Sequence, residues 1–190
     1  MKYRDAAALQ AAYRCQIAEI REKIRVARSA IEPEDVQDYV FATPEGPVSL
    51  SALFGDKDTL FVVHNMGTGC ANCTMWADGF SGVFPHLRDR AAFVVSSPDA
   101  PDRQQRFAAD RGWRFPMVST QGTTFAEDMG YRSENGPLPG LSVFKRQSGR
   151  MVRVADSAFD RADDFCPVWH LFDLLPESDA GWRPKNSYAG

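Results

Sequence analysis

The stretch that decides the fold runs from Leu60 to Cys73 and reads LFVVHNMGTGCANC. Its first four residues form an uninterrupted apolar run, which is typical of a strand buried on both faces of a sheet. A turn with two glycines follows, and Cys70 and Cys73 then open a helical pattern. A buried strand, a turn and a helix that begins with two close cysteines predict a thiol site at the start of that helix.

The spacing of the two cysteines suits thiol-disulfide chemistry. The unpaired N–H groups and the dipole of a helix N-terminus favour an anion, so a thiolate is expected at Cys70. A lowered thiol pKa makes that sulfur a nucleophile near neutral pH, and Cys73, one helical turn later, can resolve a mixed disulfide. His64 ends the buried strand, so we expect it to be structural.

The composition is that of an ordinary soluble domain. The 190 residues are 44% hydrophobic and 25% charged, which suffices for one packed core. The net charge of −3 gives no broad basic surface, so neither nucleic acid nor an anionic membrane is expected as a partner. The N-terminus has no apolar core of signal-peptide type, and a cytoplasmic location is expected. In that compartment, four cysteines favour catalysis or metal binding over a disulfide scaffold.

Helical and extended patterns flank the cysteine stretch. Upstream, apolar steps of three and four residues predict a long amphipathic helix over 5–31, and a hairpin is expected with strands over 38–43 and 48–50. Downstream, strands over 92–96 and 115–118 alternate with helices over 101–111 and 123–129, which predicts parallel βα units. Strands over 141–144 and 151–154 should pair antiparallel, and a closing helix is expected over 161–175.

This order of elements predicts an α/β protein of thioredoxin-like fold, with a central mixed sheet flanked by helices. We expect a peroxiredoxin-like insertion and an N-terminal extension made of a helix and a hairpin. The expected division is a helical extension over 1–37, a thioredoxin-like domain over 38–178 and a C-terminal tail over 179–190. The apolar stripe of the long helix must be covered by its own domain or by a partner, so a homodimer is one expected arrangement.

Five short motifs carry a resemblance to a known family: Gly69-Cys-Ala-Asn-Cys73, Trp76-Ala-Asp-Gly-Phe80, Pro85-His-Leu87, Gly112-Trp-Arg-Phe-Pro116 and Pro139-Gly-Leu-Ser-Val-Phe144. From about residue 39 to residue 176 the chain resembles the bacterial thioredoxin-like family of unknown function DUF899. That family is similar in fold to thioredoxins and to the alkyl hydroperoxide reductase branch of peroxiredoxins. The resemblance implies a redox reaction on a disulfide or a peroxide, with a cellular thiol reductant and no cofactor.

The resemblance also implies a substrate groove beside the cysteines. Thioredoxin-like proteins place a cis-proline opposite the active-site cysteine, and Pro139 stands at that point of the chain. Gly69 occupies the position of a thioredoxin tryptophan, and Thr68 is similar to the threonine that precedes the reactive cysteine of peroxiredoxins. With Trp76, these residues are the expected lining of the groove.

Two other functions could use the same residues. Cys166 and His170 stand four residues apart and would complete a structural zinc site with Cys70 and Cys73. Against this, Cys166 and Cys15 are expected to be buried small hydrophobic side chains. The second alternative is a non-catalytic binding module that holds a partner in the groove.

Overall fold

The chain, described by a computed structural model over residues 1–161 and 163–188, forms two compact units, Met1–Pro33 and Glu34–Gly190. The first unit is a single helix, α1 (Tyr3–Ser29), as the apolar spacing predicts. No side chain of α1 is buried, so the expectation that Cys15 is buried is wrong; Tyr13 and Ile17, on the apolar stripe, are exposed as well. No helix in the described ranges is long and apolar enough to cross a membrane.

The second unit is built on a mixed sheet with strand order β1-β10-β9-β4-β5-β6-β2-β3. Its strands are β1 (Glu34–Asp35), β2 (Val40–Thr43), β3 (Gly46–Ser49), β4 (Thr59–His64), β5 (Ala92–Ser97), β6 (Met117–Ser119), β9 (Gly140–Gln147) and β10 (Arg150–Ala158). Strands β4, β5 and β6 are parallel, and β2–β3 and β9–β10 are the two expected antiparallel hairpins. The short strands β7 (Arg132–Ser133) and β8 (Gly136–Pro137) form a separate ribbon.

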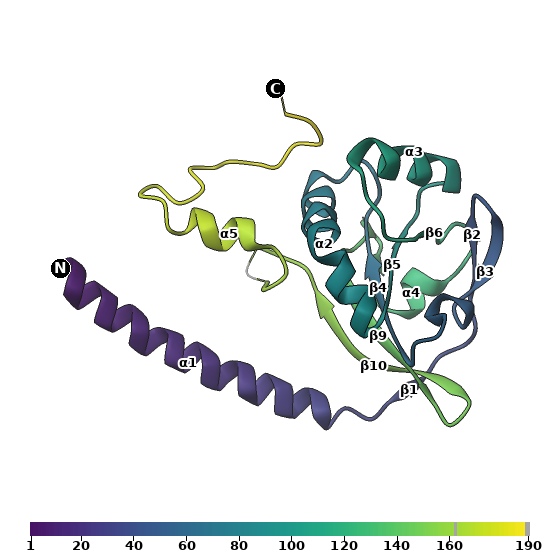
Figure 1. The fold of residues 1–190 in the computed structure, drawn as a ribbon, viewed down its shortest axis with the longest axis horizontal. Coiled ribbons are helices and arrows are strands. Elements are labelled where there is room, and N and C mark those ends of the chain that lie inside the picture. The colour runs from purple at the N-terminus through teal and green to yellow at the C-terminus, as the bar shows by residue number, and fades with distance from the viewer. Residues whose placement is uncertain (162, 189–190) are drawn as a thin grey trace. The chain divides into compact units, whose positions relative to one another are not determined.

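Helices cover both faces of this sheet, with α2 (Ala71–Arg90) and α4 (Phe125–Asp128) on opposite sides in Figure 1. The whole apolar run of β4 is buried because both faces of this strand are covered. Phe61 and Val63 pack into the cluster that holds α2, while Leu60 and Val62 pack into the cluster that holds α4. The first cluster also receives side chains of α3 (Pro101–Arg111) and α5 (Pro167–Phe172), and the second those of the 3₁₀ helix η1 (Ala52–Phe54). The predicted α/β fold with a two-sided core is therefore confirmed.

The C-terminal helix is shorter than the sequence predicts. A helix is expected over 161–175, of which residue 162 lies outside the described residues, but α5 runs only from Pro167 to Phe172. The carboxylate of Asp163 accepts hydrogen bonds from the N–H groups of Phe165 (2.7 Å) and Cys166 (3.2 Å), a local turn that competes with a helix. Pro167 then begins the helix, because its fixed φ suits the first helical position.

Gly140 controls the packing at the end of the sheet where β4 stops. It pairs with His64, the last residue of β4. A Cβ at this position would lie 2.0 Å from Cε1 of Tyr131 and 2.8 Å from the carbonyl oxygen of Ser157. The ring of Tyr131 stacks on His64 with 3.9 Å between ring centroids. Only glycine therefore leaves room for this stack beside β10.

We expect Gly140→Ala to lower the free energy of unfolding by roughly 1–3 kcal/mol, because the added methyl group overlaps both Tyr131 and the backbone of β10. Gly79→Ala, within α2, is the matched control, since no atom lies within 4 Å of a Cβ built there. That control should leave stability unchanged or raise it by at most about 1 kcal/mol. Urea denaturation measures both effects, and equal stability of the two variants would contradict the prediction.

Candidate functional site

Cys70 is the residue that caps the N-terminus of α2. Its Sγ accepts a hydrogen bond from the backbone N–H of Cys73 at 3.2 Å, in the geometry that serine or asparagine oxygens adopt at this position. The helix dipole adds positive potential at the same place. The Cys70 side chain is half-buried, whereas Cys73 is only 3% exposed. The two expected thiols therefore lie together, and the accessible one belongs to Cys70.

The two thiols have opposite pKa shifts. A hydrogen bond from the Cys73 side chain is the main cause that lowers the pKa of Cys70 to about 6; N–H groups of Cys73 and Asn72 help, while partial burial opposes the shift. The hydrogen bond to Cys70, followed by burial, raises the pKa of Cys73. Near neutral pH the pair therefore holds one thiolate, on Cys70, and one thiol, on Cys73.

The loop between β4 and α2 is fixed by acceptors that the sequence analysis missed. Asn65 Oδ1 accepts a hydrogen bond from the Gly67 N–H at 2.8 Å, and Asp99 Oδ2 accepts one from the Thr68 N–H at 2.6 Å. The Cys70 N–H donates to the Gly67 carbonyl at 3.0 Å. Gly67 has a φ of +105°, and a Cβ there would lie 2.9 Å from Asp99 Oδ2. The turn before Cys70 therefore needs glycine at 67 and is held by a carboxylate from the next βα loop.

Thr68 is tied to two further segments. Its hydroxyl accepts a hydrogen bond from Arg103 Nε at 2.7 Å, and its carbonyl accepts one from Asn186 Nδ2 at 3.1 Å. Arg103 also forms an ion pair with Asp99 at 3.5 Å. Arg103 lies on α3, 35 positions along the chain from Thr68, and no local sequence pattern predicts that it contacts the cysteine loop. Thr68 thus lies near Cys70 in the loop, but its polar groups serve to hold the loop.

Gly69 is part of the cysteine loop, and Pro139 lies at the same end of the β4–β9 strand pair as that loop. Gly69 is exposed next to Cys70. Pro139 directly precedes Gly140, which pairs with His64, the last residue of β4. Because the two strands are antiparallel, the chain enters β9 at the same end at which it leaves β4 for the cysteine loop. The expectation of a cis bond at Pro139 is wrong, since no peptide bond in the described ranges is cis. The trans form is the one that an X–Pro bond adopts more readily.

Trp76 belongs to the core. Its side chain is 5% exposed and packs on Phe159 with 5.3 Å between ring centroids. Its Nε1 is buried without a hydrogen-bond partner in the described structure. The structure therefore places Trp76 on the core-facing side of α2, where it packs the helix onto the apolar cluster and presents no open surface to a substrate.

The zinc alternative receives no support. Over the described ranges, no three His, Cys, Asp or Glu side chains lie close enough to hold a metal ion. Cys166 is buried in the apolar cluster that also contains Cys73, whereas His170 is exposed and its Nε2 lies 3.0 Å from the carbonyl oxygen of Asp163. Cys166 is the N-cap residue before α5, with an extended backbone, so its thiol and the imidazole of His170 do not share one helix face.

Comparison with known sequences extends the resemblance over nearly the whole chain. Residues 2–185 match the family described as "Bacterial protein of unknown function (DUF899)". The chain belongs to the DUF899 family. No curated protein matches the sequence.

Peroxiredoxins are among the solved structures to which this fold is similar. The DUF899 chain is similar to peroxidoxin BcpB from Mycobacterium tuberculosis, with 24% identity, a TM-score of 0.55 and coverage of 66% of this chain and 84% of that one. Peroxiredoxin Q from Xanthomonas campestris gives 16% identity, a TM-score of 0.57 and coverage of 75% and 90%. AhpC from Enterococcus faecalis gives 13% identity and a TM-score of 0.55, with coverage of 69% of this chain and 82% of that one. At these identities the likeness shows the thioredoxin-type fold alone.

His64 of this DUF899 protein is a buried, neutral histidine. Its ring stacks on Tyr131 and, at 5.3 Å between centroids, on Phe125. Its Nε2 lies 2.9 Å from Ser142 Oγ, while Nδ1 is buried without a partner among the described residues. Burial is the main cause that lowers the pKa of His64 to about 3, and the charge of Arg153 lowers it further. This side chain therefore packs the end of β4 in its uncharged form.

We expect His64 to make the folded state sensitive to acid. Its pKa is lower in the folded chain than its ordinary value of 6.5, so stability is full above about pH 6.5 and falls towards pH 3, where the folded form also protonates. Between pH 7 and pH 5 the wild type should lose roughly 2 kcal/mol more unfolding free energy than His64→Phe, which keeps a stacked ring. Urea denaturation at both pH values measures this, and parallel losses would contradict it.

Cys70 should react with iodoacetamide with a midpoint near pH 6, because only its thiolate is nucleophilic. In Cys73→Ala the hydrogen bond that contributes most to the lowered pKa is gone, so the midpoint should move to higher pH. Peptide-level mass spectrometry of the alkylation rate against pH gives both values. An unchanged midpoint in the variant would show that Cys73 does not stabilise the thiolate.

Proposed function

We propose that this DUF899 protein is a dithiol-disulfide oxidoreductase in which Cys70 attacks a disulfide or a peroxide and Cys73 resolves the product. The observation that carries the proposal is the half-buried sulfur of Cys70 at the start of α2, which accepts the Cys73 N–H and has its pKa lowered to about 6. The structure holds both cysteines as free thiols, the reduced form from which such a reaction starts.

With a disulfide substrate, the Cys70 thiolate attacks one sulfur and a mixed disulfide forms, while the other sulfur leaves as a thiolate and takes a proton from water. Cys73 then attacks Cys70 Sγ, and its proton passes to the substrate sulfur that departs. The second substrate thiol leaves, and an intramolecular disulfide closes. The substrate gains the two electrons that the dithiol loses. Because Cys73 is buried, it is protected from external disulfides and available only to its neighbour.

With a peroxide substrate, the same thiolate attacks one oxygen of the O–O bond. A sulfur–oxygen bond forms, the O–O bond breaks, and the other oxygen leaves as an alcohol or as water after protonation. Cys73 then attacks the sulfenic acid of Cys70, releases water and closes the same disulfide. In both routes a cellular thiol reductant reopens the disulfide and is itself oxidised.

The local environment supports the proposal because it separates the tasks of the two sulfurs. An attacking thiol must be ionised and accessible, and Cys70 meets both conditions. A resolving thiol must remain protonated until the first step is complete, and the raised pKa of Cys73 has that effect. Self-association, expected from the apolar stripe of α1, stays a prediction.

Cys70→Ser should lower turnover at least 100-fold with either an insulin disulfide or hydrogen peroxide as substrate and dithiothreitol as reductant. Cys73→Ser should stop after the first attack, so mass spectrometry should find a mixed disulfide on Cys70 after disulfide treatment. Cys15→Ser, on the exposed surface of α1, is the matched control and should keep full activity.

Undiminished turnover in Cys70→Ser would refute the proposed chemistry. No turnover in the wild type, together with partner binding that survives both cysteine substitutions, would instead identify the non-catalytic binding module.

A further inference from the structure

The turn that delivers Cys70 to the start of α2 is bound at its second residue, Thr68. The Cys70 N–H closes this turn on the Gly67 carbonyl at 3.0 Å. The N–H of Thr68 donates to Oδ2 of Asp99 (2.6 Å), and the Thr68 hydroxyl accepts a hydrogen bond from Nε of Arg103 (2.7 Å). Because Thr68 lies inside the turn, these two contacts fix the direction in which the chain enters Cys70.

Arg103 joins the two contacts of Thr68 to each other. Its Nε also lies 3.5 Å from Oδ1 of Asp99, the carboxylate whose other oxygen holds the Thr68 N–H. Because 62% of the Arg103 side chain is exposed, this ion pair adds little free energy of its own. Its effect is on orientation, since the guanidinium keeps both the hydroxyl and the carboxylate directed at one point of the loop.

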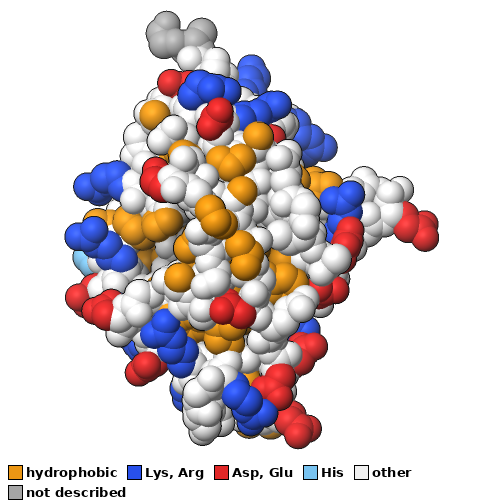
Figure 2. Space-filling view, turned by 90° about the vertical axis from the view of Figure 1, so that its right-hand side faces the viewer, with side chains coloured by type: hydrophobic (Ala, Val, Ile, Leu, Met, Phe, Trp, Pro, Cys, Tyr) orange, Lys and Arg blue, Asp and Glu red, His pale blue; other side chains and the backbone are white. Residues whose placement is uncertain are grey.

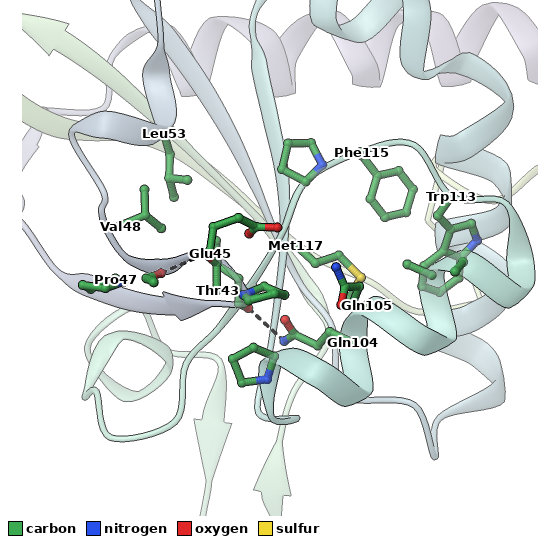
Figure 3. Close-up of a pocket in the computed structure, with 17 residues that line it drawn as sticks. Thr43, Glu45, Pro47, Val48, Leu53, Gln104, Gln105, Trp113, Phe115 and Met117 are labelled. Carbon is green, nitrogen blue, oxygen red and sulfur yellow. Dashed lines mark hydrogen bonds between the residues drawn. The ribbon is translucent and has the colours of Figure 1, made fainter.

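Helix α3 presents Arg103 from a fixed position. The next residue, Gln104, is 1% exposed, and its amide donates to the Val118 carbonyl of β6 at 3.0 Å (Figure 3). It also donates to Ser97 Oγ of β5 at 2.8 Å, and the same hydroxyl accepts the Asp99 N–H at 3.3 Å. On its other side, α3 borders a cavity with the β2–β3 hairpin, and hydrophobic side chains gather across the middle of the view in Figure 2. The first turn of α3 is therefore anchored to the sheet independently of the cysteine loop.

The contacts that ionise Cys70 depend on where this loop ends. The hydrogen bonds that lower the pKa of Cys70 come from the side chain and N–H of Cys73 and from the N–H of Asn72. All of them require the Cys70 sulfur to stay against the first turn of α2. A residue that holds the preceding turn can therefore control the thiolate without touching it.

We propose that Arg103 is a positioning residue of the dithiol site, which holds the Thr68 hydroxyl and the Asp99 carboxylate together and so keeps Cys70 Sγ against the start of α2. This role rests on the nucleophilic function of Cys70 proposed above. Arg103 acts through Thr68, and its own charge is not the source of the effect.

Three substitutions separate the contact from the charge. Arg103→Gln places an amide N–H where Nε stands and removes the charge, whereas Arg103→Met removes both, and Thr68→Val removes only the hydroxyl. Alkylation of Cys70 by iodoacetamide should keep its midpoint near pH 6 in the wild type and in Arg103→Gln. In Arg103→Met and Thr68→Val the midpoint should rise by roughly 0.5–1 pH unit, which lowers the rate at pH 5 by a factor of roughly 3–10.

The double variant Thr68→Val with Arg103→Met should shift the midpoint no further than Arg103→Met alone, because both changes break the same contact. Arg106→Met, on the exposed surface of the same helix, is the matched control and should leave the midpoint unchanged. Circular dichroism of each variant checks that the fold is retained, since the exposed Arg103 side chain is not needed for the core.

Equal upward shifts in Arg103→Gln and Arg103→Met would show that the charge acts directly and would overturn the proposal. An unchanged midpoint in Thr68→Val, or additive shifts in the double variant, would overturn it as well. Alkylation needs no substrate turnover, so a wild type that is inactive with both disulfide and peroxide would refute the proposed function and leave this test intact.

Discussion

The hydrogen bond from the Cys73 N–H to the sulfur of Cys70 is the contact on which the candidate site depends. It caps helix α2 at Cys70. Together with the hydrogen bond from the Cys73 side chain, which is the larger cause of the lowered pKa, it stabilises negative charge on the Cys70 sulfur. One local interaction therefore links the start of a helix with the ionisation of a nucleophile. The buried Cys73 side chain lies on the core side of the same turn and completes the pair.

That contact is positioned by the loop before it and by the sheet beneath it. Asp99 holds the N–H of Thr68, and the positive φ of Gly67 lets the chain turn towards the helix. The loop starts from β4, which lies between β5 and β9 in the middle of the sheet and packs on both faces. A strand held in this way has little freedom, so the cysteine at its end is presented on a rigid support.

Gln104 and His64 each bury one polar atom without a hydrogen-bond partner among the described residues. Ser97 is the last residue of β5, and its hydroxyl accepts a hydrogen bond from the amide of Gln104. The same amide also donates to the Val118 carbonyl and so joins β5 to β6. This cross-link uses the nitrogen of the amide and leaves the oxygen buried without a hydrogen-bond partner among the described residues. The unpaired atom of His64 is Nδ1, and the imidazole ring that carries it packs against the ring of Tyr131. Both unpaired atoms are therefore enclosed by the core, and each is a cost of the packing around it.

The sequence by itself determined what depends on local spacing. The apolar steps of α1, the bounds of α3, the double-sided burial of β4 and the cysteine pair at the start of α2 all follow from residues close together in the chain. Only the tertiary structure decided what depends on distant partners: the hold of Asp99 and Arg103 on the cysteine loop, the place of Trp76 in the core and the trans bond at Pro139. The fixed amide of Gln104 belongs to the same group, since its partners lie on two other elements. The physical reason is that helix and strand periodicity is a property of neighbouring side chains, whereas hydrogen bonds across the sheet and the shapes of cavities exist only once separate segments have packed.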